Sequence, residues 1–540
     1  MCSFFVFNFL VFLQLFCIKL HKTLDKCIKI CGEALEKKIF FGGASLMLKD
    51  WTSHISYQNF ISDSVALFNE SELKRLASFS HSVEKLTALN LDTLAAFLAP
   101  YYSSIGRPAI NQAEIFRSII FMIDQHYTSL TAWVKHVKSD DLLALLIGCS
   151  PDSLPPLGSY YDFINRLWLS DPSLDKEIRK KLSRYPKDSK PKGKGPGKNK
   201  KLPNRHPDIV RKIANFFTLR RSFDARYEKL LQNLFSLIAV VPSMELGLIP
   251  KENLTIAGDG TCVHTHSSSL GTKVCKCTED GIYNCKCRRR YSDLDATYGW
   301  DSHLSTWFYG HTLYAFSTYN EQTQTDLPLL FRFVSAKRHD SVTAIVALAE
   351  LREVTSSLAI KNICLDSAND NYPTYELCNT WNYIPFIDLN ANRGKPTTLP
   401  PALSINEQGV PICQSGHEMV YNGFCKSRSR HKWRCPFKCK KVEACSLEQP
   451  CSPSSYGRVI YTKPDWDIRL FTPVPRKTKA WKEIYKTRTS SERINNRILN
   501  DYGLHQMHIH GKKRYSFFTM MIGINIHLDA RIKKANLSAT

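Results

Sequence analysis

The stretch WKEIYKTRTSSERINNRILND, from Trp481 to Asp501, contains no proline or glycine and repeats apolar residues at helical intervals. This pattern predicts a helix. At roughly 100° per residue, Tyr485, Arg488 and Glu492 fall on one stripe of that helix. The stripe sets a carboxylate beside a cation and a phenol. A solvated helix face gives the same pattern, so its meaning depends on the rest of the chain.

Two aspartates upstream end short β-rich apolar runs. Asp259 ends the predicted strand in LTIAGDGT, and Asp366 follows the apolar residues of KNICLDSAND. A sheet presents side chains at its edge where such strands end. We therefore expect both carboxylates to lie at the edge of a sheet.

The elements around these aspartates follow a distinctive order. Their predicted ranges are strand 254–259, strands 307–320 and 327–338, helix 340–354, strand 362–369, a helix around 374–381, and strand 383–390. This order resembles the ribonuclease H-like fold, an α/β fold with a mixed sheet and flanking helices. Its first and fourth strands are neighbours, so Asp259 and Asp366 should lie close together, and the helix at 481–501 can bring Glu492 to them.

Three carboxylates in one place repel one another, which raises some of their pKa values and favours binding of a divalent cation. Oxygen-only ligands select Mg²⁺ or Mn²⁺. Asp259, Asp366 and Glu492 are therefore the expected metal ligands and catalytic residues. Two ions roughly 3.5 to 4 Å apart would support in-line phosphoryl displacement. Arg488 suits a DNA phosphate by its bidentate fork, and Tyr485 could bond the same backbone.

The composition of the chain indicates a polyanionic partner. At 540 residues, with 43% hydrophobic residues, the chain is long enough for two to four domains with real cores. Lysine and arginine number 73 against 49 acidic residues, which leaves a net charge of +24. Nucleic acid is the commonest partner for such a charge, although a merely basic protein is the alternative.

The first 46 residues form an apolar leader that we expect to be dispensable. The segment lacks a basic beginning and a small-residue cleavage site, and Asn8 and Gln14 interrupt its apolar run. We interpret it as an extension upstream of Met47 and expect no membrane association, with a membrane anchor as the alternative. Eighteen cysteines in a long chain without a convincing export signal favour reduced thiols and metal sites.

The remaining chain divides by composition. Residues 71–182 have helical patterns typical of an all-α DNA-binding domain, although a helix-turn-helix reader and a plain helical bundle both fit. Residues 183–207, rich in lysine, proline and glycine, predict a flexible basic linker. The catalytic domain is expected over 208–400, with a cysteine-rich insertion at 262–292, and again over 476–534. A second cysteine-rich insertion is expected between these parts, at 401–475.

The two insertions carry the candidate zinc ligands. CKCTEDGIYNCKC places Cys275, Cys277, Cys285 and Cys287 as two C-x-C pairs around a turn, which is compatible with tetrahedral Zn²⁺. The second group is looser, with a basic stretch, SRSRHKWRC, that suggests contact with DNA. Its cysteines are Cys413, Cys425, Cys435, Cys439, Cys445 and Cys451, and His417 and His431 lie nearby. Free thiols in variable insertions are the alternative for both groups.

The chain resembles DDE transposases of bacterial insertion sequences, whose late motif reads Tyr-x2-Arg-x3-Glu-x6-Lys. YKTRTSSE supplies Tyr485, Arg488 and Glu492 at this spacing, but Leu499 stands where the motif has lysine. DLDATYGWDS, WFYGH and KRHDSV resemble motifs between the two aspartates. The early segment IGRPAINQAEIFRSIIFMIDQHY resembles the helical domain that accompanies such enzymes. The resemblance covers roughly residues 85 to 530.

The resemblance implies an enzyme that binds terminal inverted repeats, cleaves DNA with Mg²⁺ or Mn²⁺ and joins the 3′-hydroxyl to a target. It also implies double-stranded DNA as partner, a homodimer on DNA, and a cytoplasmic, nucleoid-associated location. Two alternatives remain: a ribonuclease H-like nuclease that does not join, and an inactive, transposase-derived DNA-binding protein. Inverted repeats around the reading frame would favour transposition over both.

Overall fold

The computed structural model describes residues 48, 50–103, 105–169, 183–184, 207–219, 226–390, 399–400, 403–449 and 451–539. The chain separates into two compact units. The first comprises Met1–Lys49 and Leu98–Ile110, and its described part includes a short 3-10 turn, η1 (Ala99–Tyr101). Apart from Leu98, the last residue of α5, every element discussed below belongs to the second unit, Asp50–Phe97 and Asn111–Thr540. The leader predicted over residues 1–46 lies outside the described residues.

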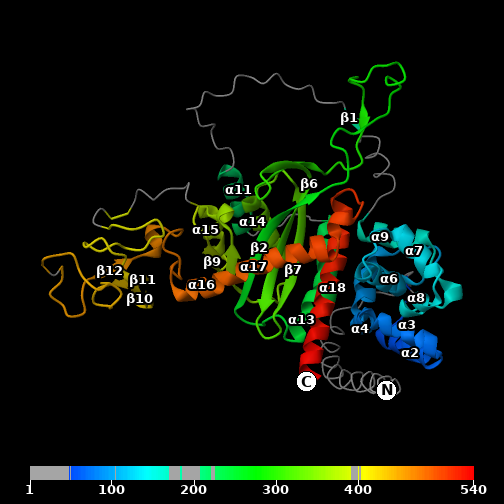
Figure 1. Ribbon diagram of the computed structural model, residues 1–540, viewed down its shortest axis with the longest axis horizontal. Helices are drawn as coiled ribbons and strands as arrows, with labels where there is room; N and C mark the ends of the chain where they lie inside the picture. The colour runs from blue at the N-terminus through cyan, green and yellow to red at the C-terminus, as the bar shows by residue number, and fades with distance from the viewer. Residues whose placement is uncertain are drawn as a thin grey trace. The chain divides into compact units, whose positions relative to one another are not determined.

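A six-stranded mixed sheet forms the centre of the second unit (Figure 1). Its strand order is β5-β6-β2-β8-β9, and β7 also pairs with β6. The strands are β2 (Leu254–His264), β5 (Thr297–Asp301), β6 (Thr306–Asn320), β7 (Thr325–Ser335), β8 (Ile360–Leu365) and β9 (Ile384–Ile387). β6 runs antiparallel to β2, β5 and β7, whereas β8 is parallel to both β2 and β9. The predicted order of strands and helices is confirmed, and β5 is an edge strand that the pattern did not reveal.

Helices cover the sheet because its central strands are apolar and buried. β6 is buried along most of its length, as an antiparallel strand packed on both faces requires. Helices α14 (Asp340–Val354), α17 (Thr489–Asn496) and α18 (Lys512–Ala539) pack against β6 or β7. The outer side of α14 packs against α11 (Pro207–Thr218) through a small apolar core that includes Val210, Ala214 and Ile345.

One predicted boundary was wrong at the first strand. β2 does not end at Asp259 but continues to His264, so Asp259 lies in its interior. The reason is that β6 pairs with β2 without interruption from Ala257 to His264. The two glycines beside Asp259, which indicated a strand end in the sequence, are accommodated within the ladder.

The helix predicted over Trp481–Asp501 is confirmed as a helical run from Lys479 to Asp501, with changes of pitch. It comprises α16 (Lys479–Tyr485), the 3-10 turn η8 (Lys486–Arg488), α17 and a π turn, η9 (Arg497–Asp501). Trp481 anchors its beginning in an apolar cluster with Ala257 and Phe386 from the sheet. The run therefore crosses from β9 towards β2 and β6.

The N-terminal region is helical, as the sequence predicts. Its helices are α2 (His54–Ala66), α3 (Glu70–Ser78), α4 (Ser80–Ala88), α5 (Asp92–Leu98), α6 (Gln112–Asp124), α7 (Leu130–Lys138), α8 (Asp141–Leu146) and α9 (Leu157–Leu167). α2 precedes the predicted start of this region at residue 71. α4 and α6 both pack against the C-terminal helix α18. Among the described residues, no helix is both long and apolar enough to cross a bilayer.

The predicted linker lies almost wholly outside the described residues. Within 183–207, Ser183 and Arg184 form the short strand β1, and Pro207 begins α11. The predicted helix after the linker is present as α11 and α12 (Arg226–Phe235), and α12 continues through a π turn, η3 (Ser236–Val240), into α13 (Val241–Glu245).

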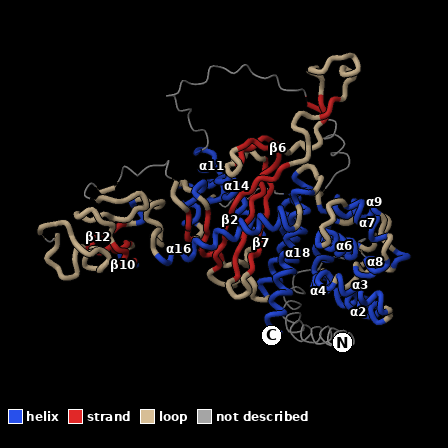
Figure 2. Tube along the Cα trace, in the orientation of Figure 1, coloured by secondary structure: helices blue, strands red, loops and turns tan. Residues whose placement is uncertain are grey.

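Both cysteine-rich insertions are built mainly from loops around small sheets (Figure 2). In the first, β3 (Thr272–Lys273) and β4 (Arg289–Arg290) pair with each other, and β4 also pairs with β1. In the second, β10 (Val420–Cys425), β11 (Arg430–Arg434) and β12 (Val459–Thr462) form a three-stranded antiparallel sheet with β11 in the middle.

Candidate active site

Asp259 and Asp366 lie level with each other on neighbouring parallel strands. The ladder between β2 and β8 pairs Ala257 with Cys364, and each aspartate follows two residues later. Asp366 comes directly after the last residue of β8 and accepts a hydrogen bond of 2.6 Å from the amide of Asn369. The predicted neighbourhood of these two carboxylates is therefore present in the fold.

Glycines on both sides of Asp259 let other side chains approach the strand closely. A Cβ on Gly258 would lie 2.9 Å from the hydroxyl of Tyr314, and a Cβ on Gly260 would lie 2.7 Å from a carboxylate oxygen of Asp340. Neither distance leaves room for a side chain. Because side chains alternate along a strand, both glycines face the side of β2 opposite to the Asp259 side chain. They therefore let a phenol and a fourth carboxylate approach β2 on that opposite face.

Asp340 and Tyr314 were not among the sequence-predicted site residues. Asp340 begins α14, directly after KRH at the end of a predicted strand, and an acid at that junction was the signal available for it. Tyr314 lies inside the apolar run of β6 and carried no signal, because nothing in the sequence shows that it pairs with Gly260 and packs against Gly258.

Glu492 reaches this region on α17, which packs against both β2 and β6. Ser490, on the buried side of α17, accepts a hydrogen bond of 3.0 Å from Ser317 and donates one of 3.2 Å to the carbonyl of Thr318. These bonds fix the helix on β6. On its exposed side, Arg488 and Glu492 form an ion pair of 2.7 Å.

Burial and neighbouring carboxylates raise the pKa values of Asp259 and Asp340. Burial, followed by the charges of Asp366 and Asp340, raises the pKa of Asp259 to about 7. Burial and Asp366 raise the pKa of Asp340 to about 6. The Tyr314 hydroxyl is buried and has no hydrogen-bond partner among the described residues. Burial raises its pKa well above the ordinary value. These groups form one electrostatic cluster.

The carboxylates of the site influence one another electrostatically, but their oxygen atoms are not gathered at one point. Among the described residues, no three acidic side chains bring oxygen atoms within 4.8 Å of one another. Glu492 is 46% exposed and held by Arg488, whereas Asp259, Asp340 and Asp366 are half-buried. The structure therefore brings Asp259, Asp366 and Asp340 into one neighbourhood and leaves Glu492 at its solvent edge.

Tyr485 and Arg488, the two residues predicted to bind phosphate, have different surroundings. The Tyr485 hydroxyl donates hydrogen bonds of 3.0 Å to the Asp388 carboxylate and 3.3 Å to the carbonyl of Leu365, and its ring stacks on Trp481. Arg488 lies near enough to Asp259 to lower its pKa, against the dominant effects. Arg488 thus faces the acidic cluster, while Tyr485 is engaged by the protein.

The lysine position of the late motif, which is Leu499 here, and the nearby Arg497 both have structural roles in this chain. Arg497 forms an ion pair of 2.8 Å with Asp529 of α18, and the Tyr502 hydroxyl donates to the same carboxylate over 2.6 Å. Leu499, which replaces the motif's lysine, is buried. Neither residue is available to a phosphate at the acidic site.

The first cysteine group forms a compact set of thiols in the loop between β3 and β4. The sulfur atoms of Cys275, Cys277, Cys285 and Cys287 all lie within 4.8 Å of one another, with Sγ–Sγ distances of 3.5 Å (Cys275–Cys285) and 3.6 Å (Cys277–Cys287). Tetrahedral zinc with Zn–S bonds of about 2.3 Å separates sulfurs by roughly 3.8 Å. The backbone amide of Cys277 lowers the pKa of Cys275 to about 7. This group could hold a zinc ion.

The second cysteine group does not gather in this way. Within the described part of the chain, the first group is the one set of three or more potential ligands whose donor atoms all lie within 4.8 Å of one another. The insertion is held instead by an apolar core of Val410, Met419 and Trp433. The geometry therefore gives no support to the predicted zinc site at Cys413, Cys425, Cys435 and Cys439.

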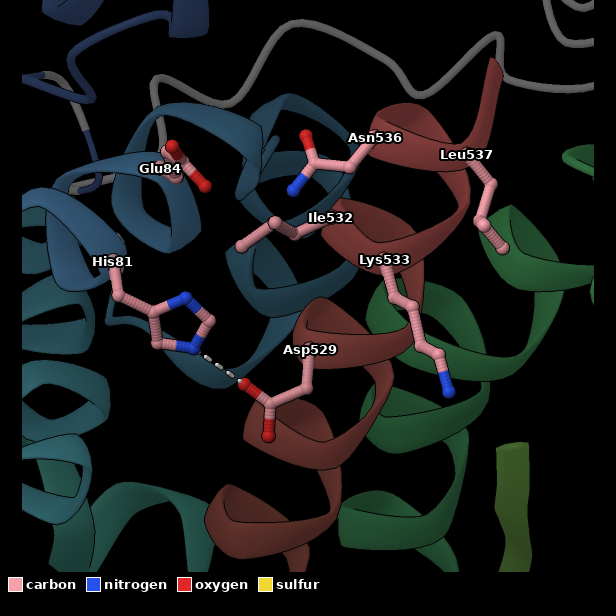
Figure 3. A pocket seen from close by; sticks show the side chains of 7 residues that line it. All are labelled: His81, Glu84, Asp529, Ile532, Lys533, Asn536 and Leu537. Atoms are coloured by element: carbon pink, nitrogen blue, oxygen red, sulfur yellow. Dashed lines mark hydrogen bonds and ion pairs between the residues drawn. The ribbon is translucent and has the colours of Figure 1, made fainter. Parts of the chain in front are cut away.

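A separate hollow lies between α4 and α18 (Figure 3). His81 points across it to Asp529 at 3.0 Å, and Ile532 and Lys533 also line it. Lys85 and Arg497 already pair with Asp529, so its charge is neutralised by the protein. Glu84 and Asp529 are the acidic residues in its lining.

Comparison with known protein families concerns the later part of the chain, which contains neither Asp259 nor Asp366. A family model described as a transposase DDE domain matches residues 412–528, a range that contains Glu492 and most of the second insertion. The match supports a DDE transposase and DNA as its partner. No curated protein matches the chain.

Proposed function

We propose that this protein is a DNA transposase of a bacterial insertion sequence, which cleaves DNA at the element ends and joins the 3′-hydroxyl to target DNA. One observation carries the proposal. Asp259 and Asp366 lie level on neighbouring parallel strands, and the helix with Glu492 packs across those strands. The sheet order β7-β6-β2-β8-β9 supports a ribonuclease H-like catalytic domain.

The residues of the acidic site fit a divalent cation. Their donor atoms are oxygens, which suit Mg²⁺ or Mn²⁺. Burial and the neighbouring carboxylates raise the pKa values of Asp259 and Asp340, so a cation that neutralised these carboxylates would be favoured. Asp259, Asp366 and Glu492 are the proposed ligands. When bound, the cation would activate a water or 3′-hydroxyl for attack on phosphorus and stabilise the leaving oxygen.

The chain's own residues would orient the DNA and move protons. Asp340, with a pKa of about 6, can take up a proton near neutral pH, as a general base must. Arg488 can exchange Glu492 for a phosphate of the DNA, which frees the carboxylate for the cation. Tyr485 would also bind a DNA phosphate. Its hydroxyl, which donates a hydrogen bond to Asp388, must then donate to the DNA backbone instead.

Other segments would provide the rest of the DNA contacts. We propose that residues 71–182 bind the element ends, that the basic segment 183–207 contributes phosphate contacts, and that two copies act together on DNA at the nucleoid in the cytoplasm. A zinc ion at Cys275, Cys277, Cys285 and Cys287 would stabilise the first insertion.

The experiment uses the full chain and DNA carrying the sequences that flank its reading frame. With Mg²⁺, the parent should nick these ends and produce joined products with a target plasmid, while Asp259→Asn, Asp366→Asn and Glu492→Gln should bind DNA and neither cut nor join. Cleavage without joined products would favour the nuclease alternative. Binding without cleavage by the parent would favour the inactive DNA-binding protein.

A further inference from the structure

The middle strand of the second insertion has two chemically different faces. Because side chains alternate along a strand, Arg430, Lys432 and Arg434 share one face of β11, while His431 and Trp433 share the other. We call the first set the β11 cationic face. Its three cations span roughly 13 Å at the usual strand rise.

Aromatic rings hold these cations in place. The guanidinium of Arg430 lies 3.5 Å from the ring centre of Tyr461, and that of Arg434 lies 3.3 Å from the ring centre of Tyr456. The Lys432 ammonium is 4.6 Å from the Tyr456 ring centre and 3.0 Å from its hydroxyl oxygen. Cation–π contacts of this kind fix the direction of long side chains without neutralising their charge.

The charge of this face is not compensated. Within the described residues, none of the three cations forms an ion pair with a carboxylate, in contrast to Arg469 and Arg493 elsewhere in the chain. Residues 412–462 contain nine lysines and arginines against three acidic residues. The local field is therefore strongly positive.

The opposite face makes the strand rigid. Trp433 packs against Val410 and Met419, and its indole donates a hydrogen bond of 3.0 Å to Thr462 of β12. β10 and β12 pair with β11 on both edges. The cations therefore stand on a fixed platform, so little conformational entropy is lost when they bind a partner.

We propose that the β11 cationic face is a docking surface for the sugar-phosphate backbone of double-stranded DNA. This inference rests on the proposed function, which makes DNA the substrate. Along 13 Å of axis, duplex DNA carries roughly eight phosphate charges, enough to engage all three cations. Arginine matches phosphate oxygens with its planar fork, and contacts to phosphates fix the position of the protein on DNA without reading bases. The face therefore provides affinity and position, not sequence recognition.

The test compares two triple variants of the full chain. Arg430→Gln, Lys432→Gln and Arg434→Gln together remove three charges from the β11 cationic face. Lys438→Gln, Lys440→Gln and Lys441→Gln remove three charges from an exposed turn of the same insertion. Binding to a mixed-sequence DNA duplex is measured by fluorescence anisotropy between 50 and 200 mM salt, and circular dichroism checks that each variant is folded.

The first variant should weaken binding and reduce the slope of log K against log salt by roughly 2 to 3, since each phosphate contact contributes about 0.9. The second should change the slope by less than about 1. Equal effects of both variants would overturn the assigned surface, because DNA binding would then depend on the total charge of the insertion and not on the β11 cationic face. A first variant that binds like the parent would also overturn it.

Tyr456 provides an independent test that leaves every charge in place. Tyr456→Phe keeps the ring under Arg434 and Lys432, whereas Tyr456→Leu removes it. The leucine variant should bind DNA at least about threefold more weakly than the phenylalanine variant, because the cations lose their support. Equal binding would overturn the role of the ring. Metal-dependent cleavage by the parent tests the proposed function separately. The parent can cleave DNA even if the β11 cationic face makes no contribution to DNA binding.

Discussion

Arg488 and Glu492 are joined by an ion pair of 2.7 Å across one helical turn, on the exposed side of the helix that crosses the two aspartate-bearing strands. The pair is 25% and 46% exposed on its two side chains, so solvent screens it and it adds little to stability. Its position next to Asp259 indicates a role in binding rather than in folding.

Two arginines of this helical run make a matched test of that role. Arg493 donates two hydrogen bonds, of 2.6 and 2.7 Å, to Asp326 of β7. Arg488→Gln should lower the DNA cleavage rate at least about 10-fold, since a charge-assisted hydrogen bond contributes about 1.5–3 kcal/mol, and leave the melting temperature nearly unchanged. Arg493→Gln should lower the melting temperature and keep cleavage near the parent rate. A reversed pattern would make Arg488 the structural residue.

The pH dependence of stability should report on Asp259. Its pKa is raised from an ordinary value near 3.8 to about 7, so the folded protein holds this proton more tightly than the unfolded chain. The stability from the protonated form is complete below pH 4 and is lost as pH rises through 7. Metal-free Asp259→Asn should therefore melt higher than the parent at pH 7.5 and at the same temperature at pH 4.

Added Mg²⁺ extends this measurement. At pH 7.5 the cation should raise the melting temperature of the parent, because it binds the folded state and neutralises the carboxylates. It should have a much smaller effect on Asp259→Asn. Equal shifts in both proteins would place the cation elsewhere.

The sequence was sufficient for the order of strands and helices because apolar runs and helical periodicity are local patterns. It also placed Asp259 and Asp366 on neighbouring strands, since a known strand order carries that information. The predicted end of β2 was wrong because two glycines, Gly258 and Gly260, are typical of a strand end. The ladder to β6 and the close approach of Tyr314 and Asp340 depend on segments distant in the sequence.

The cysteine groups show the same limit. Cys275, Cys277, Cys285 and Cys287 lie in one hairpin, so their spacing alone indicated a cluster, which the structure contains. The second group is spread over a long insertion, where only the path of the chain decides which thiols meet. The basic stretch within this insertion, by contrast, is visible in the sequence and predicted contact with DNA. The structure adds that Arg430, Lys432 and Arg434 share one face of β11.

Zinc content should separate the two cysteine groups. Protein purified under reducing conditions without added metal should contain about one zinc ion per chain, as four thiolates bind one ion. Cys275→Ser with Cys285→Ser should remove it, whereas Cys413→Ser with Cys439→Ser should not. Elemental analysis measures this directly. A content near zero in the parent would leave the first group as free thiols, and about two would restore the second site.

The last prediction concerns the contact between the N-terminal helices and the C-terminal helix. The ammonium of Lys85 on α4 is 3% exposed and pairs with Asp124 of α6 and, at 2.7 Å, with Asp529 of α18. Removing one partner of a buried ion pair leaves an uncompensated charge, which costs about 3–5 kcal/mol. Lys85→Met should therefore lower the urea midpoint of unfolding strongly. Lys486→Met breaks an exposed pair with Glu483. This change should alter the free energy of unfolding by less than about 0.5 kcal/mol. If both variants unfold at the same urea concentration, Lys85 does not hold these helices together, and the N-terminal helices are then free to act as a separate DNA-binding domain.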